Sequence, residues 1–164
     1  SRAFGGDAPA PRAAGDSPLA AEWESARRKS EEAMSTLALH EWIGALWEFV
    51  GAANRYVDAE KPWELVKAAK AGDEEARARL AGVIGDLLEA CRLVALFAAP
   101  VIPTVSEKIW ILLGYQWPYD ASGHGSILRS DLAGWGSATR SGPLGEPTPL
   151  FPRLDADEPT TSAD

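Results

Sequence analysis

The segment from residue 36 to residue 57 constrains the fold most, because its apolar side chains recur at steps of three and four residues. The recurring side chains are Leu39, Trp42, Ile43, Leu46, Phe49, Val50, Ala53 and Val57. This spacing lays them along one wide stripe of a helix, which a helical bundle would bury. The pattern ends near Asp58, because Pro62 disfavours helix in the residue before it. Pro62 can also open a short new helix that closes at Gly72.

Similar patterns predict three further helices, over residues 18–34, 73–99 and 103–114. Ser17 is expected to cap the first of these helices, with a proline at the first helical position. Asp73 is expected to cap the second. The third begins and the second ends beside prolines, which cannot continue a helix.

The amino-acid composition of the chain changes after the last of these helices. Residues 115–149 are rich in Gly, Ser and Pro, with one short helix expected at residues 126–132 and no alternation that would predict a sheet. The sequence therefore predicts an all-α helical bundle with an irregular C-terminal segment that packs back on it. It also divides the chain into a connector at residues 1–18, a helical domain at 19–154 and an acidic tail at 155–164.

The charge of the chain argues against a protein that grips a nucleic-acid duplex. The formal net charge is −8, with 24 acidic and 16 basic residues, and four of the acidic residues lie in 155–164, which leaves −4 for the rest. Phosphate contacts need Lys and Arg, but a domain that reads a few unpaired bases by stacking could tolerate this charge. A helical module that binds only other proteins is the alternative that the charge favours.

The sequence also limits the chemistry and the location of the protein. It contains one cysteine, which excludes an internal disulfide and favours a reducing cytoplasm, and no apolar run reaches the roughly 20 residues that span a membrane. Its two histidines and its cysteine lie far apart, so no metal site is expected. No G-x-G-x-x-G, G-x-x-x-x-G-K-[ST] or H-E-x-x-H motif occurs, and no catalytic residue is assigned.

Seven tryptophans are many for 164 residues, and most have a structural interpretation. We expect core positions for Trp42, Trp47 and Trp110, a core or partly exposed position for Trp23, and a pinning role in the C-terminal segment for Trp117 and Trp135. Trp63 differs because it follows a proline at a break between helices. An exposed indole there could stack on an unpaired base, worth about 1–3 kcal/mol per base. The alternative is a tryptophan that closes the helix junction.

Residues 53–67 read A-N-R-Y-V-D-A-E-K-P-W-E-L-V-K and resemble a stretch of methionyl-tRNA synthetases. The L-F-A-A-P-V-I-P run at residues 96–103, the L-F-P-R-L-D run at 150–155 and the F-G-G at 4–6 are similar to that family in order and spacing. The resemblance covers about residues 1–155. It implies the helical anticodon-binding domain of a class I aminoacyl-tRNA synthetase.

The resemblance implies a parent enzyme that activates methionine with ATP and transfers it to tRNA(Met). The chain would recognise the CAU anticodon, with the anticodon loop and the parent's catalytic domain as its partners. ATP, with zinc as an option, would belong to that catalytic domain, and the fragment itself would hold no cofactor. The domain of a valyl-, leucyl- or isoleucyl-tRNA synthetase is the alternative, which the L-F-P-R-L ending disfavours.

The resemblance also assigns candidate anticodon-binding residues. Trp63 matches the family's stacking tryptophan, and Pro62 is its neighbour at the same corner. Asp58 could select bases through its acceptor oxygens. Asn54 and Arg55 lie one turn further back, where structural capping is the alternative role.

The sequence departs from the family in what it lacks. The catalytic signatures H-[IL]-G-H and K-M-S-K-S are absent, and the family's asparagine–arginine pair would lie just upstream of Ser1. Because the chain starts without an initiator Met, we interpret it as a fragment that holds half of the anticodon site. Weak binding of tRNA by the isolated fragment is therefore expected.

Overall fold

The computed structural model describes residues 8–119 and 129–151. Its elements are α1 (Pro18–Ser35), α2 (Leu39–Glu60), α3 (Pro62–Lys70), α4 (Glu74–Ala98), α5 (Pro103–Leu112) and the 3₁₀ turn η2 (Ser130–Leu132). No strand occurs within those two ranges, and the predicted all-α fold is confirmed. Of the short helix expected at 126–132, the turn η2 is the described part. The expected acidic tail lies outside the described residues.

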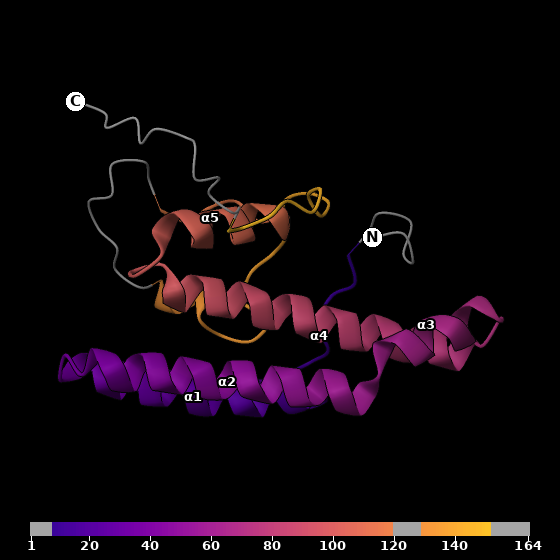
Figure 1. Ribbon diagram of the computed structural model, residues 1–164, viewed down its shortest axis with the longest axis horizontal. Helices are drawn as coiled ribbons and strands as arrows, with labels where there is room; N and C mark the ends of the chain where they lie inside the picture. The colour runs from indigo at the N-terminus through magenta and orange to yellow at the C-terminus, as the bar shows by residue number, and fades with distance from the viewer. Residues whose placement is uncertain (1–7, 120–128, 152–164) are drawn as a thin grey trace, which may run out of the picture.

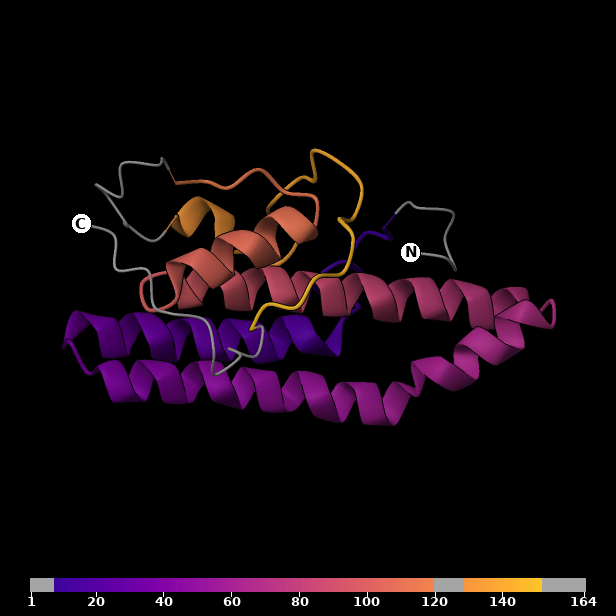
Figure 2. The same ribbon diagram turned by 45° about the horizontal axis from the view of Figure 1, so that its top comes forward.

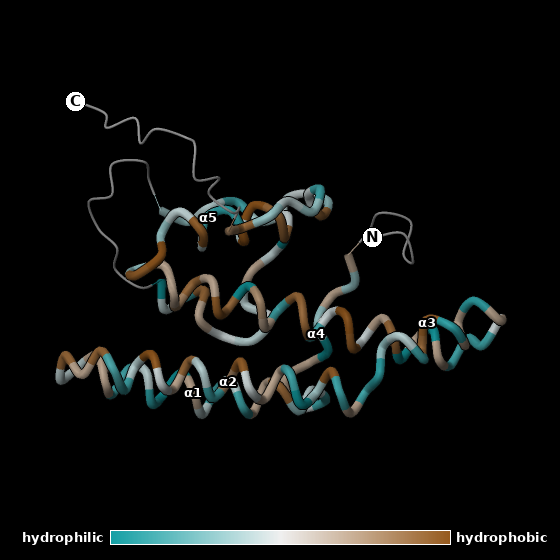
Figure 3. The backbone as a smooth tube through the Cα atoms, in the orientation of Figure 1, coloured by the Kyte–Doolittle hydropathy of each residue, from teal (hydrophilic) through white to brown (hydrophobic). Residues whose placement is uncertain are grey.

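Helix α4 is the central element, because it contacts each of the other four α-helices. Helices α1 and α2 form a hairpin along one side of α4, and α5 lies over the opposite side of its C-terminal half (Figure 1; Figure 2). Helix α3 leaves the end of α2 and lies alongside the beginning of α4. Figure 3 shows hydrophobic and hydrophilic residues alternating along α1 and α2, as amphipathic helices require.

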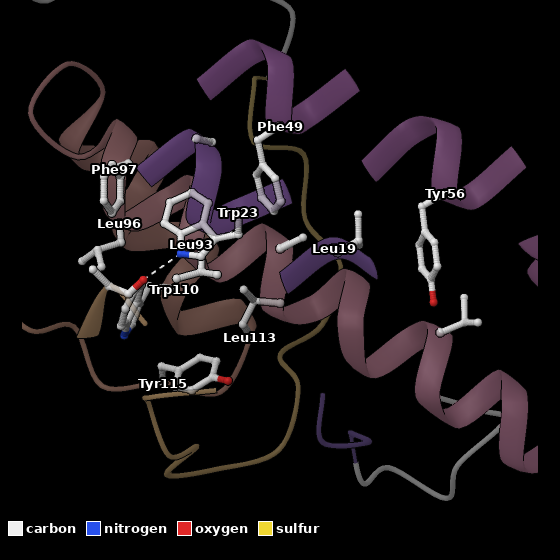
Figure 4. Packing of buried hydrophobic residues seen from close by; sticks show 14 residues of the cluster. Leu19, Trp23, Phe49, Tyr56, Leu93, Leu96, Phe97, Trp110, Leu113 and Tyr115 are labelled. Carbon is white, nitrogen blue, oxygen red and sulfur yellow. Dashed lines mark hydrogen bonds between the residues drawn. The ribbon is translucent and has the colours of Figure 1, made fainter. Parts of the chain in front are cut away.

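Trp23 lies at the centre of the hydrophobic core (Figure 4). Its ring packs edge-on against Phe49 and Phe97, with centroids 5.0 and 4.7 Å away. Its indole N–H donates a hydrogen bond to the carbonyl of Ala133 at 2.7 Å. Trp23 therefore joins the helical hairpin both to α4 and to the irregular C-terminal segment.

The predicted burial of Trp47 is wrong, because this side chain is 67% exposed. The buried positions of α2 are Trp42, Ala45, Phe49, Ala52 and Tyr56. They form a narrower stripe than the apolar pattern suggests, since α1 and α4 cover only one side of the helix. Trp47 instead lines an apolar groove between α2, α4 and α5, beside Leu87 and Leu112. Trp42, Trp110 and Trp23 are buried, as the sequence allowed.

Three charged side chains of α4 are fully buried, which the helical pattern did not predict: Asp86, Glu89 and Arg92. Arg92 pairs with Glu89 at 2.6 Å and donates hydrogen bonds to the carbonyls of Leu132 and Gly134. Such groups are tolerated in a core because each is hydrogen-bonded or paired. The two charges thus hold the C-terminal segment against α4, in agreement with the predicted packing.

The N-terminal segment is held by Asp86. The Arg12 guanidinium pairs with the Asp86 carboxylate at 2.6 Å, and the Ser17 hydroxyl donates to the same carboxylate at 2.7 Å. Ser17 is the N-cap residue of α1, as predicted, but its hydroxyl bonds the buried Asp86 carboxylate and makes no side-chain hydrogen bond to the helix N–H groups. The cap by Asp73 is confirmed, since its carboxylate accepts a hydrogen bond from the amide of Ala76 at 2.9 Å.

Tyr56 couples the pH dependence of stability to this network. Burial raises the pKa of Tyr56 to about 12, and the negative charge of Asp86 adds to the rise. An unfolded chain would lose the phenolic proton near pH 10, so the folded state binds more protons between pH 10 and 12 and loses stability there, by about 2 kcal/mol. Urea unfolding at several pH values should show a flatter profile for Tyr56→Phe over this interval. Equal losses in both proteins would contradict the prediction.

Candidate nucleic-acid interface

The corner between α2 and α3 contains a single non-helical residue, Lys61. Its backbone is left-handed, with φ of 46°, which is uncommon for a residue with a side chain. The Lys61 amide donates to the carbonyl of Val57 at 2.9 Å and closes α2, while the Glu64 amide donates to the carbonyl of Lys61 at 2.8 Å in the first turn of α3. Pro62 then supplies the first residue of α3 with its φ already restricted.

Contacts on both sides of the corner fix its position on the bundle. Glu60, the last residue of α2, pairs with Arg79 of α4 at 2.9 Å. One turn earlier, the Tyr56 hydroxyl points toward α4, where it contacts Asp86 (Figure 4). On α3, Leu65 packs against the hydrophobic core. The sequence does not predict the two polar contacts, because Arg79 is 19 residues from Glu60 in the chain and Asp86 is 30 residues from Tyr56.

The indole of Trp63 is 50% exposed and lies outside the hydrophobic core. Of the two interpretations that the sequence allowed, the structure therefore favours the exposed one. Trp63 is the second residue of α3, directly after the corner. A large flat side chain is thus presented to solvent from a backbone that is fixed on both sides.

The other candidate residues occupy the last turns of α2 and the corner itself. Asn54, Arg55 and Asp58 are exposed, and Pro62 is half-buried. Asn54 and Asp58 share one face of α2 because they are four residues apart. The structure therefore gathers Asp58, Pro62 and Trp63 at the corner, with Asn54 one turn back along the helix.

Among the described residues, neither Asn54 nor Asp58 makes an ion pair or a side-chain hydrogen bond. The Arg55 guanidinium lies back over Gly51, where its Nη1 atom is 3.4 Å from the position that a Cβ would take. The structure thus gives no support to a capping role for Asn54 or Arg55. It leaves their polar atoms available to a ligand.

The described part of the chain offers little sign of other chemistry. No group of three or more His, Cys, Asp or Glu residues there could hold a metal ion. No helix described in this structure is long and apolar enough to cross a membrane.

Comparison of the sequence with known proteins identifies relatives among the methionine–tRNA ligases. No family model matches the chain. The methionine–tRNA ligase of Thermosynechococcus vestitus is 35% identical over 118 residues, which are 72% of this chain and 21% of the relative. That of Streptomyces coelicolor is 33% identical over 159 residues, which are 93% of this chain and 28% of the relative. The chain thus spans between a fifth and a third of these relatives.

Comparison with solved structures also identifies methionyl-tRNA synthetases. Apo methionyl-tRNA synthetase of Mycobacterium tuberculosis superposes with a TM-score of 0.73 at 28% identity, over 94% of this chain and 29% of that one. The same enzyme bound by methionyl-adenylate superposes with a TM-score of 0.74 at 28% identity, over 92% of this chain and 28% of that one. Over most of its length, the chain is therefore homologous to the C-terminal part of the methionine–tRNA ligases.

Proposed function

We propose that this chain is the anticodon-binding domain of a methionyl-tRNA synthetase and that the corner between α2 and α3 binds the CAU anticodon loop of tRNA(Met). The observation that carries the proposal is the half-exposed indole of Trp63 on a rigid corner. Homology to methionine–tRNA ligases supports it independently. The longer enzyme would join methionine to tRNA(Met) with ATP in the cytoplasm, and its catalytic domain would bind ATP and, as an option, zinc.

The chemistry of the corner suits an unpaired loop. A base turned out of the anticodon stack could lie flat on the Trp63 indole, an interaction that tolerates any base. Selection between bases would come from polar groups, because the Asp58 carboxylate accepts hydrogen bonds and cytosine and adenine carry exocyclic amino donors. Asn54 offers both a donor and an acceptor. Arg55 would contact phosphate or stack its guanidinium plane on a base.

Trp63→Ala is expected to weaken binding of a CAU anticodon stem-loop by about 5- to 150-fold, which corresponds to the 1–3 kcal/mol of one stacked base. The melting temperature should change by no more than about 2 °C, because the side chain is half exposed and contributes no core contact. Fluorescence anisotropy with a labelled stem-loop measures the first quantity and circular dichroism the second.

Trp47→Ala is the matched control, since Trp47 is exposed like Trp63 but lies on α2, away from the corner. It lines the apolar groove, which it shares with Asn54 but not with Asp58, Pro62 or Trp63. We expect unchanged binding for this variant. Two results would contradict the proposal: equal affinity of the unaltered chain for CAU and scrambled loops, or equal losses for the two tryptophan variants. A protein-interaction module would give the first of these results.

A further inference from the structure

Helix α3 presents one exposed face that continues from Trp63. The exposed residues of the helix are Trp63, Glu64, Lys67 and Lys70, and the others are at least half-buried. Residues 63, 67 and 70 are separated by four and three positions, so they lie on the same face of the helix. The helical rise of 1.5 Å per residue places the two lysines about 6 and 10 Å along the axis from Trp63.

The positive charge of this face is not neutralised within the described chain. Glu64 is paired with Lys61 at 3.5 Å, whereas neither Lys67 nor Lys70 forms an ion pair with a described residue. Both lysines lie in the last turn of α3. There the helix dipole stabilises a positive charge by about 0.3–1 kcal/mol. The dipole accounts for a positive charge at this end of the helix. It does not account for the alignment of both charges with an exposed indole.

We propose that Lys67 and Lys70 hold the sugar-phosphate backbone of the strand whose base stacks on Trp63, so that the RNA strand follows α3 away from the corner. This inference rests on the proposed function. An ammonium group is a flexible point charge, and its contact with phosphate adds affinity without reading sequence. Trp63 and Asp58 would then act on the bases, and the two lysines would act on the backbone.

The division of roles predicts a change in salt dependence. Each phosphate contact on a single strand contributes about 0.7 to the slope of log K against log salt, so Lys67→Gln with Lys70→Gln should reduce the slope by about 1.4. Affinity at low salt should fall on the order of tenfold. The ratio of affinities for CAU and scrambled loops should stay the same. Trp63→Ala should leave the slope unchanged, because stacking releases no counterions.

The control is Arg28→Gln with Lys108→Gln, which removes the same charge from exposed positions on α1 and α5. Lys67→Arg with Lys70→Arg should restore the slope. Titrations with the stem-loop at several salt concentrations measure the slope for the unaltered chain and for these four variants. An unchanged slope in the double lysine variant, or an equal change in the control, would overturn the inference. In either case, a loss of binding in Trp63→Ala would leave the proposed function standing.

Discussion

Arg92→Met is expected to lower the free energy of unfolding by about 3–5 kcal/mol, because it leaves the carboxylate of Glu89 buried without its partner. Both side chains are fully buried, and their closest atoms are 2.6 Å apart. The guanidinium also donates to the carbonyls of Leu132 and Gly134 at 2.7 and 2.9 Å. The variant would therefore weaken the attachment of the C-terminal segment to α4, in addition to leaving an unpaired charge in the core. Urea unfolding followed by circular dichroism measures the loss.

Two further variants test this interpretation: the first is a surface control, and the second separates the ion pair from the hydrogen bonds. Arg27→Met is the surface control: Arg27 pairs with Glu24 and Glu31 in partly exposed contacts, and its loss should cost less than about 1 kcal/mol. Adding Glu89→Gln to Arg92→Met should recover part of the stability but not all of it, because the Leu132 carbonyl has lost its donor, at about 1–3 kcal/mol. The Gly134 carbonyl still accepts a hydrogen bond from the Ser137 hydroxyl at 2.8 Å. Equal costs for the Arg27 and Arg92 variants would contradict the structural role described above.

Trp23→Ala is expected to cost about 3–5 kcal/mol and to lower the melting temperature on the order of 10 °C. The indole fills the centre of the core between Phe49 and Phe97, and its removal would leave a cavity that the helices cannot close without moving. The variant also strands the carbonyl of Ala133, which loses its donor. Differential scanning calorimetry gives the change directly.

Trp23→Phe provides the internal comparison, because it keeps an aromatic ring and removes the N–H donor. We expect an intermediate loss for this variant. Trp47→Ala should change stability by no more than about 0.5 kcal/mol, as expected for an exposed position. If the Trp23 and Trp47 variants melted together, the core described for this bundle would be wrong.

The sequence determined the helices and their ends, because these depend on interactions within a few residues. Pro18, Pro62 and Pro103 each stand at the first position of a helix, where a missing N–H costs nothing. Gly72 has a φ of 95° and ends the turn before α4, and Asp73 caps that helix. The resemblance to methionyl-tRNA synthetases likewise rests on short motifs, which lie at or between the ends of these helices.

Burial of the charged residues of α4 could not be read in the same way. Asp86, Glu89 and Arg92 follow one another at steps of three, which is also the spacing of a solvated helix face. Their burial depends on partners distant in the chain, since Arg12 is 74 residues from Asp86 and Gly134 is 42 residues from Arg92. Local patterns contain no information about contacts at that separation.

The same difference applies to the tryptophans and to the candidate site. The sequence placed Trp23, Trp47 and Trp63 in or beside helices, and helical periodicity favoured burial for Trp47. Only the packing of α1 and α4 against one side of α2 left Trp47 exposed, and only the contact of α3 with α4 turned Trp63 outward. Local chemistry therefore determined where the helices and the corner lie. The tertiary structure decided which faces remain open to a ligand, because exposure depends on which helices cover each face.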